Sequence, residues 1–178
     1  FPFYFATDFF LPEADEWRSE AWAMIKERQD LSFVIETKRE HRFFKALPGD
    51  WGDGYENVTI LCSVEIQRRA DDRIPAFLKL PVRHKGILCE PLLEKLVLDA
   101  YLKTGEIAQV LCGGEQGADA RVCDFAWVLE LMNQCVNCGV AFRFLRTGTF
   151  FRKGNRIYRI AEEEQEEQAR RAGVDYTP

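Results

Sequence analysis

The sequence has no apolar run near the roughly 18 residues that a membrane-spanning helix needs, and no leader that would mark a signal peptide. Histidine is scarce, with two residues in 178. His41 and His84 lie far apart and belong to no acid–base motif. The GxSxG turn of α/β-hydrolases and the HExxH helix of zinc proteases are also missing. We therefore expect no membrane contact and neither of these two catalytic machineries.

An excess of positive charge is missing too. Lysine and arginine number 24 and aspartate and glutamate 29, which gives a net charge of −5. Nonspecific binding to duplex nucleic acid depends on basic surface, so this balance argues against it. A nucleic acid held in a local basic cleft stays open as a partner.

The six cysteines do not form the pattern of a secreted disulfide framework, which usually belongs to a shorter, loop-rich chain. Cys62, Cys89 and Cys112 lie in apolar runs, where a free cysteine behaves as a small hydrophobe. Cys135-x-x-Cys138 has no second CxxC or histidine pair to complete a tetrahedral zinc site, so a structural role is favoured. We expect reduced thiols and a cytoplasmic location.

Six short apolar runs recur along the chain. They are nearly continuous and do not alternate, which is typical of strands buried on both faces of a parallel sheet. The chain starts at Phe1 without an initiator methionine, and its first residues already have the pattern of a buried strand, so we expect further residues upstream. The predicted strands are residues 3–6, 32–35, 58–63, 86–89, 109–112 and 140–144.

Helical patterns separate these strands. Asp124 is a predicted N-cap and Gly139 a predicted helix end, and weaker helical segments cover residues 70–80 and 92–103. Strands that alternate with helices predict an α/β fold of right-handed βαβ units, here a parallel (β/α) partial TIM-type barrel of about six strands. A further helix follows Pro12, with one predicted apolar face made by Trp17, Ala21, Met24 and Ile25.

The last part of the chain departs from this repeat. Residues 150–160 (FFRKGNRIYRI) predict a β-hairpin around Gly154-Asn155. Residues 161–172, acidic and then basic, predict an exposed helix. We therefore divide the chain into a barrel portion, residues 1–149, and a C-terminal hairpin with a charged tail, residues 150–178, which packs on or extends from the same domain.

Every predicted strand is followed by polar or charged residues. In parallel βα folds the ligand site lies beyond the carboxyl ends of the strands, because the loops there are free to carry function. Carboxylates and bases would then share one rim, although a solvated rim with structural ion pairs would give the same pattern. The candidate cofactor- or substrate-binding residues are Thr7, Asp8, Thr37, Lys38, Arg39, Ser63, Glu65, Glu90, Gly113, Gly114, Glu115 and Arg121.

Three glycines follow the fifth predicted strand. Gly113-Gly114-x-x-Gly117 would let backbone N–H groups approach an anion such as phosphate or carboxylate. The motif is neither a Walker loop nor a GxGxxG fingerprint, and a tight turn forced by sterics explains it equally well.

The strand-end phrases form an ordered set: Thr7-Asp8-Phe9-Phe10, Thr37-Lys38-Arg39, Ser63-Val64-Glu65, Ala70-Asp71-Asp72-Arg73-Ile74-Pro75, Cys89-Glu90-Pro91-Leu92-Leu93, Gly113-Gly114-Glu115 and Ala120-Arg121. With them, and with residues 134–144, the chain resembles a phage-associated radical-SAM-like family of unknown function. Members of that family are three-cysteine-motif proteins with a TIM-type barrel. The resemblance runs over about residues 3–160.

This resemblance implies a [4Fe–4S] cluster, held by three cysteines ahead of the strands seen here, that binds S-adenosylmethionine. It also implies a methyltransferase-like partner protein. The chain has no such cysteine triplet, so the implied protein is a radical-SAM-like enzyme core of unknown substrate without its cluster-binding segment. Thr37, Ser63, Glu65, Glu90 and Glu115 would line the pocket. Lys38, Arg39 and Arg121 would hold the carboxylate of S-adenosylmethionine or an anionic substrate.

Two other functions fit the same rim. The chain is alternatively a non-catalytic barrel that binds a partner protein or nucleic acid. It is otherwise a divalent-metal-dependent hydrolase, because carboxylate oxygens are the ligands that hard divalent cations prefer. The metal ligands in that case would be Asp8, Glu65, Glu90 and Glu115.

Overall fold

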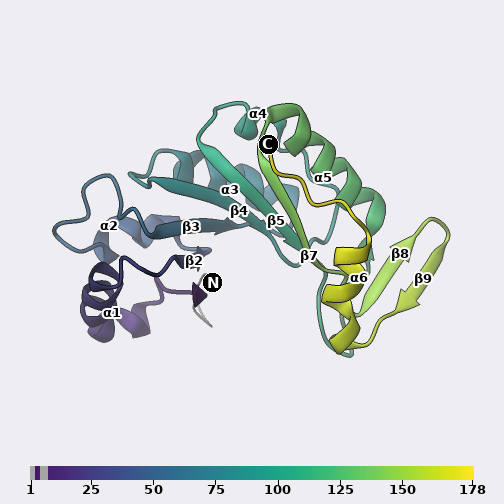
Figure 1. Ribbon diagram of the computed structural model, residues 1–178, viewed down its shortest axis with the longest axis horizontal. Helices are drawn as coiled ribbons and strands as arrows, with labels where there is room; N and C mark the ends of the chain where they lie inside the picture. The colour runs from purple at the N-terminus through teal and green to yellow at the C-terminus, as the bar shows by residue number, and fades with distance from the viewer. Residues whose placement is uncertain (1–2, 5–7) are drawn as a thin grey trace.

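The computed structural model describes residues 3–4 and 8–178, so the predicted site residue Thr7 lies outside the described residues. Its centre is a six-stranded sheet with the order β1-β2-β3-β4-β5-β7, in which every pairing is parallel (Figure 1). The predicted parallel strands are thereby confirmed, the first of them over residues 3–4. The strands are β1 (Phe3–Tyr4), β2 (Phe33–Thr37), β3 (Val58–Ser63), β4 (His84–Cys89), β5 (Ile107–Gly113) and β7 (Ala141–Arg146).

Helices connect the strands, and Figure 1 shows α3, α4 and α5 on the same side of the sheet. This follows from the strand order, because right-handed crossovers between consecutive neighbours return to one face. None of the described helices is long and apolar enough to cross a membrane. The connections contain η1 (Pro12–Ala14), α1 (Asp15–Glu27), η2 (Glu40–Arg42), α2 (Phe43–Ala46), α3 (Gln67–Leu78), α4 (Asp99–Leu102) and α5 (Phe125–Cys138).

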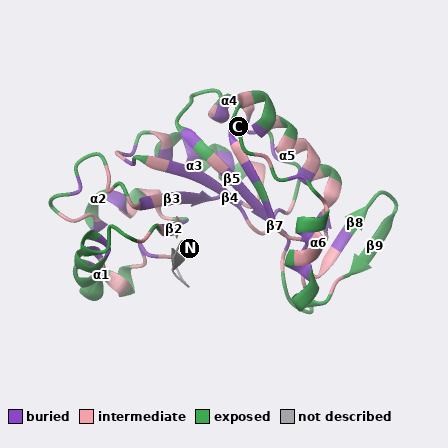
Figure 2. Cartoon of the chain, viewed as in Figure 1, coloured by how far each residue is buried: buried purple, intermediate pink, exposed green. Residues whose placement is uncertain are grey.

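The sheet is buried on both faces, and Figure 2 shows that its central strands carry many of the buried residues. One face packs against the helices in the larger hydrophobic cluster, which includes Ile60, Ile87 and Val110. The opposite face, called the inner face below, carries a smaller cluster of Val34, Leu61, Leu88 and Leu111, with Leu145 packed against it. Burial on both sides explains why the strands are apolar without alternation.

The ends of α5 follow the sequence prediction. The Asp124 carboxylate accepts a hydrogen bond of 2.9 Å from the backbone N–H of Ala126. At the other end Gly139 has φ 64°, the left-handed conformation that ends a helix and suits glycine. Both caps therefore act where the sequence places them.

The face that α1 buries differs from the predicted one. Trp17 and Met24 are exposed, whereas Arg18, Trp22 and Ile25 are buried. The predicted burial is therefore wrong for Trp17 and Met24 and confirmed for Ile25. Arg18 is stable in the interior because its guanidinium donates hydrogen bonds to two carbonyl oxygens of the preceding loop.

The predicted helix over residues 92–103 is reduced to the single turn of α4. The backbone N–H of Val97 donates to Oε1 of Gln67 at 2.7 Å. The N–H of Leu98 likewise donates to Oε1 of Gln134 at 2.6 Å. These side chains take the place of intrahelical carbonyl acceptors, so the segment before α4 stays irregular.

The sheet is open, with β1 and β7 at its edges. Near the C-terminus the chain covers the edge of β7: Phe142 and Tyr176 exchange backbone hydrogen bonds of 2.8 and 2.9 Å, and the N–H of Phe144 donates to Asp175 Oδ1 at 2.9 Å. The helix α6 (Gln165–Arg171), which follows η3 (Glu162–Glu164), lies beside the same strand. The fold is therefore α/β with a parallel sheet, which does not close into a barrel within the described residues.

A second, smaller sheet has the order β6-β8-β9. Its strands are β6 (Cys123–Asp124), β8 (Phe150–Lys153) and β9 (Arg156–Arg159), of which β8 and β9 pair in antiparallel fashion. The predicted hairpin is thus confirmed, and it stands at one end of the molecule beside α6 (Figure 1).

Removal of residues 174–178 should destabilise the protein, because it strips the edge of β7 and the buried Val174. We expect the free energy of unfolding to fall by about 2–3 kcal/mol, from lost apolar burial and lost hydrogen bonds. Urea unfolding followed by circular dichroism measures this. The matched control removes only the exposed Thr177 and Pro178 and should change stability by under about 0.5 kcal/mol. Equal midpoints for the two truncations would contradict the role of the tail.

Candidate functional site

The carboxyl ends of the parallel strands lie at one end of the sheet, which we call the rim. Because all five pairings are parallel, the loops after these strands leave the sheet in the same direction. The predicted convergence of polar residues is therefore met for the described positions. The rim comprises Asp8, Glu36, Thr37, Lys38, Arg39, Ser63, Glu65, Glu90, Gly113, Gly114, Glu115 and Arg146.

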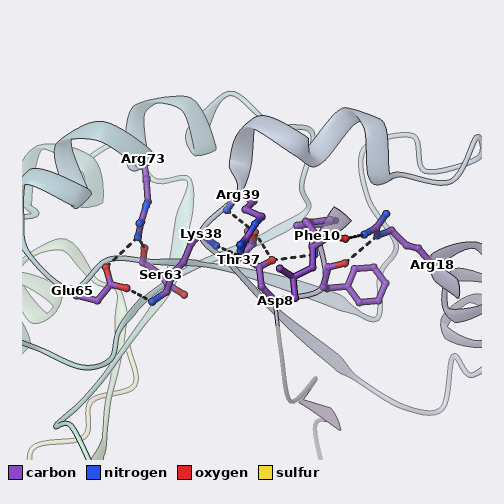
Figure 3. Close-up of polar contacts among 11 residues, drawn as sticks. Asp8, Phe10, Arg18, Thr37, Lys38, Arg39, Ser63, Glu65 and Arg73 are labelled. Carbon is purple, nitrogen blue, oxygen red and sulfur yellow. Dashed lines mark hydrogen bonds and ion pairs between the residues drawn. The ribbon is translucent and has the colours of Figure 1, made fainter. Parts of the chain in front are cut away.

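Asp8 joins the loop after β1 to the end of β2 (Figure 3). Its Oδ1 accepts hydrogen bonds of 3.0 Å from the Thr37 hydroxyl and from the backbone N–H of Phe10. Its Oδ2 accepts from Arg39 Nη1 at 2.6 Å and from the backbone N–H of Lys38 at 3.1 Å. Both carboxylate oxygens are used within the protein, so this cluster holds the two loops together.

Glu65, two residues after β3, lies between two cations (Figure 3). Lys38 Nζ contacts its Oε1, and Arg73 Nη1 lies 3.2 Å from its Oε2. Arg73 comes from α3 and also donates to the carbonyl oxygen of Ser63 at 2.6 Å. Burial raises the pKa of Glu65, but Lys38 and Arg73 more than compensate and hold that pKa below its ordinary value. Glu65 is therefore ionised and already neutralised.

Glu90, directly after β4, faces Arg146 at the end of β7. Arg146 Nε lies 2.7 Å from Glu90 Oε1 as an ion pair whose direction does not suit a hydrogen bond. Arg146 Nη1 donates to Gln116 Oε1 at 2.6 Å. Burial raises the pKa of Glu90, and the negative charge of Glu36 raises it further. The positive charge of Arg146 lowers it in part, so the pKa of Glu90 stays above its ordinary value.

Glu36 lies on β2 and alternates with Ile35 and Thr37, which places it on the inner face with Val34. Its side chain is partly buried and has no hydrogen bond or ion pair with the described residues. Burial raises its pKa, and the charges of Lys38 and Arg146 counter this only in part. Glu36 and Glu90 are thus two interacting carboxyls with raised pKa, a property that clusters at functional sites.

Glu115 is bound by Arg121 on the exposed loop after β5. The guanidinium donates two hydrogen bonds, of 2.8 and 2.6 Å, and the backbone N–H of Arg121 donates a third of 2.8 Å. The side-chain hydrogen bonds from Arg121 are the main cause that lowers the pKa of Glu115 to about 2. The pair closes the loop over residues 115–121.

The glycines after β5 allow a close approach between loops. A Cβ on Gly114 would lie 2.1 Å from the carbonyl oxygen of Thr147, and one on Gly113 would lie 2.6 Å from Glu90 Oε1. The N–H of Gly114 donates to the Arg146 carbonyl oxygen, and that of Gly117 donates to Thr149 Oγ1, both at 3.0 Å. These two N–H groups are used inside the fold, so they do not support the predicted anion cradle.

The residues present do not fit an iron–sulfur cluster or a carboxylate cation site. Within the described part of the chain, no group of three or more His, Cys, Asp or Glu side chains is placed to hold a metal ion. Five cysteines are buried, and burial raises the pKa of the Cys62, Cys123 and Cys135 thiols to about 12. Such thiols are protonated, whereas a metal ligand must be a thiolate. Each proposed cation ligand has its own basic partner: Asp8 with Arg39, Glu65 with Lys38, Glu90 with Arg146 and Glu115 with Arg121.

The candidate residues chosen from the sequence do not include Glu36, Arg73 or Arg146, which the structure brings to the rim. Glu36 does leave a signal, because a carboxylate at the end of an apolar β-strand needs a partner. Arg146 follows the sixth predicted strand and Arg73 lies in the Ala70–Pro75 phrase, but the carboxylates that they contact lie on other segments, so the sequence does not show these pairs.

Replacement of Gly114 by alanine should destabilise the fold, because the new Cβ would meet the backbone of Thr147. We expect a loss of about 1–3 kcal/mol in the free energy of unfolding, the usual cost of overpacking. Gly49→Ala is the matched control, since a Cβ there meets nothing within 4 Å, and it should stay within about 1 kcal/mol of the wild type. Urea unfolding of both variants measures this difference. Equal stability would mean that the loops of Gly114 and Thr147 can move apart without cost.

The Glu36→Gln substitution should lower the pKa of Glu90, because it removes a like charge that raises that pKa. Side-chain carboxyl carbon signals followed by NMR between about pH 3 and 8 report both groups. In the wild type Glu90 should titrate above the ordinary glutamate range. Glu20→Gln, at an exposed position, should leave the Glu90 titration unchanged. If the pKa of Glu90 is the same in Glu36→Gln as in the wild type, the two carboxyls do not interact.

Comparison with known proteins places the chain at the level of a family. A family model described as "Protein of unknown function (DUF5131)" matches residues 4–176. No curated protein and no solved structure matches the chain. Because the model covers nearly the whole chain, the protein belongs to the DUF5131 family of unknown function.

Proposed function

We propose that this chain binds a small molecule with a positively charged amino group at the rim, on the inner face, as part of a partial (β/α) barrel enzyme. The observation that carries the proposal is Glu36. Its carboxyl is half-buried and unpaired among the described residues, and it lies close enough to Arg146 and Lys38 to be affected by their charges.

The strand order supports the barrel part of the proposal. Consecutive parallel neighbours with helices on one face are the arrangement of a (β/α) barrel, whose inner face lines the interior. A doubly wound sheet would reverse its strand order and carry helices on both faces. Enzymes with barrels of this kind have their sites at the carboxyl ends of the strands, where Glu36 and Glu90 lie.

The charges of the inner face support a cationic ligand. An ionised carboxyl buried without a partner is unfavourable, and the amino group of a ligand beside Glu36 would remove that cost. Arg146 lies nearby, and its guanidinium would suit the carboxylate of the same ligand. A ligand with an amino acid group satisfies both requirements.

S-adenosylmethionine carries such an amino acid group and a sulfonium cation, and it is the ligand that the radical-SAM-like resemblance implies. The described residues do not fit the cluster that would accompany it. In this proposal the chain therefore contributes the pocket: Glu36 faces the amino group, Arg146, which also pairs with Glu90, faces the carboxylate, and the apolar inner cluster excludes water.

Isothermal calorimetry tests the proposal with S-adenosylmethionine and with methionine. We expect the wild type to bind S-adenosylmethionine and Glu36→Gln to weaken binding at least tenfold, which corresponds to about 1.4 kcal/mol. Affinity should rise with pH as Glu36 ionises, because only the carboxylate attracts the amino group, and this rise should be absent in Glu36→Gln.

The matched control is Glu20→Gln, which removes the same charge from an exposed position on α1 and should bind as the wild type does. If Glu36→Gln and the wild type bind S-adenosylmethionine with equal affinity, the proposal is wrong. So would the absence of binding for both compounds at millimolar concentration, which would favour the alternative of a barrel that binds only a macromolecular partner.

A further inference from the structure

The hairpin at the end of the molecule carries a concentration of positive charge. Residues 150–160 contain four basic residues and no acidic one, in a chain whose net charge is −5. The basic residues are Arg152, Lys153, Arg156 and Arg159, all exposed. Figure 2 shows β9 and the turn before it as exposed. The hairpin is therefore a local basic surface on an acidic protein.

Aromatic and basic side chains share one face of this hairpin. Phe151 pairs with Tyr158 across the two strands, and Lys153 pairs with Arg156. Since residues two apart along a strand point the same way, these four side chains lie on one face. Phe151 is buried, but Tyr158 is 45% exposed, so its ring remains available for contact.

A groove of about 510 Å³ lies between this face and α6. Its lining combines three aromatic residues, Phe125, Phe151 and Tyr158, with three basic ones, Lys153, Arg159 and Arg171, and one acidic one, Glu164. The ammonium of Lys153 lies 5.3 Å from the centre of the Phe125 ring. The volume is in the range of small-molecule sites, which is enough for a single nucleotide.

Two cations of the hairpin, one beside the turn and one at its base, are not neutralised by the protein. Arg156 and Arg159 form no ion pair within the described part of the chain, while Arg152 lies 3.4 Å from Asp124 and Arg171 pairs with Glu167. Arg156 and Arg159 are therefore free to contact an external anion, and the exposed ring of Tyr158 lies beside them in the sequence.

We infer that the hairpin and its groove bind single-stranded nucleic acid. Arg156 shares the face of Tyr158 and Arg159 lies on the opposite face, so the nucleic acid would follow the free edge of β9. Its phosphates would contact the two arginines and a base would stack on Tyr158, the combination of charge and aromatic surface by which proteins hold single strands. An acidic protein would satisfy the arginines but would not need the flat exposed ring. A base paired within a duplex would not be free to stack there.

The basic surface also reaches the rim. Arg159 lines a second hollow of about 440 Å³ together with Gly117 and Ala118, which belong to the loop after β5. The N–H of Gly117 donates to Thr149, the residue just before the hairpin. A bound strand would thus run from the hairpin toward the loops of the candidate site. The inference stands without the proposed small-molecule ligand.

Fluorescence anisotropy with labelled 12-nucleotide single-stranded RNA and DNA tests the inference. We expect the wild-type protein to bind at low salt, and the double variant Arg156→Glu/Arg159→Glu to weaken binding more than tenfold. The slope of log affinity against log salt should become shallower by roughly 1.4, since each phosphate contact to a single strand contributes about 0.7. Tyr158→Ala should weaken binding several-fold with little change in that slope.

A matched control reverses two exposed cations away from the hairpin, Arg68→Glu/Lys103→Glu, and should bind within twofold of the wild type. Circular dichroism checks that every variant is folded. The inference fails if neither oligonucleotide binds at 50 mM salt, or if the hairpin and control variants lose affinity equally. It also fails if polyglutamate competes as well as RNA and Tyr158→Ala has no effect, which would identify a surface for acidic proteins.

Discussion

Parallel pairing between consecutive strands is the constraint on which the structure depends. Each crossover returns to the neighbouring position, so the helices stay on one face and the strands all end at the same side. Residues as far apart in the sequence as Asp8 and Arg146 thereby reach one rim. The inner face keeps a small apolar cluster of its own, and the polar side chains at its mouth are correspondingly shielded from water.

That shielding from water explains why acidic and basic side chains are paired along the rim. Burial disfavours an isolated charge, and most of the rim carboxylates have acquired a basic partner from another segment of the chain. These pairs hold neighbouring loops together. Glu36 departs from this rule, because it has no ion pair with the described residues, and the proposed ligand site rests on that departure.

The sequence allowed the sheet to be predicted because apolar runs report burial directly, and parallel order then fixed where the loops emerge. The caps of α5 at Asp124 and Gly139 were predictable for the same local reason. The buried face of α1 was not, because Arg18 is stabilised by carbonyl groups that only the folded loop supplies. At the rim, the types of residue were predictable, but their pairing was not. Which carboxylate meets which cation depends on loop paths that no local pattern encodes.

The placement of the thiols has a practical consequence. Cys138, at the end of α5, is half-exposed, whereas the other five cysteines are enclosed in the interior and protonated at neutral pH. Alkylating reagents act on accessible thiolates, so the folded protein offers them a single point of attachment. A fluorophore or spin label placed there would report on the far end of α5 without any engineered cysteine.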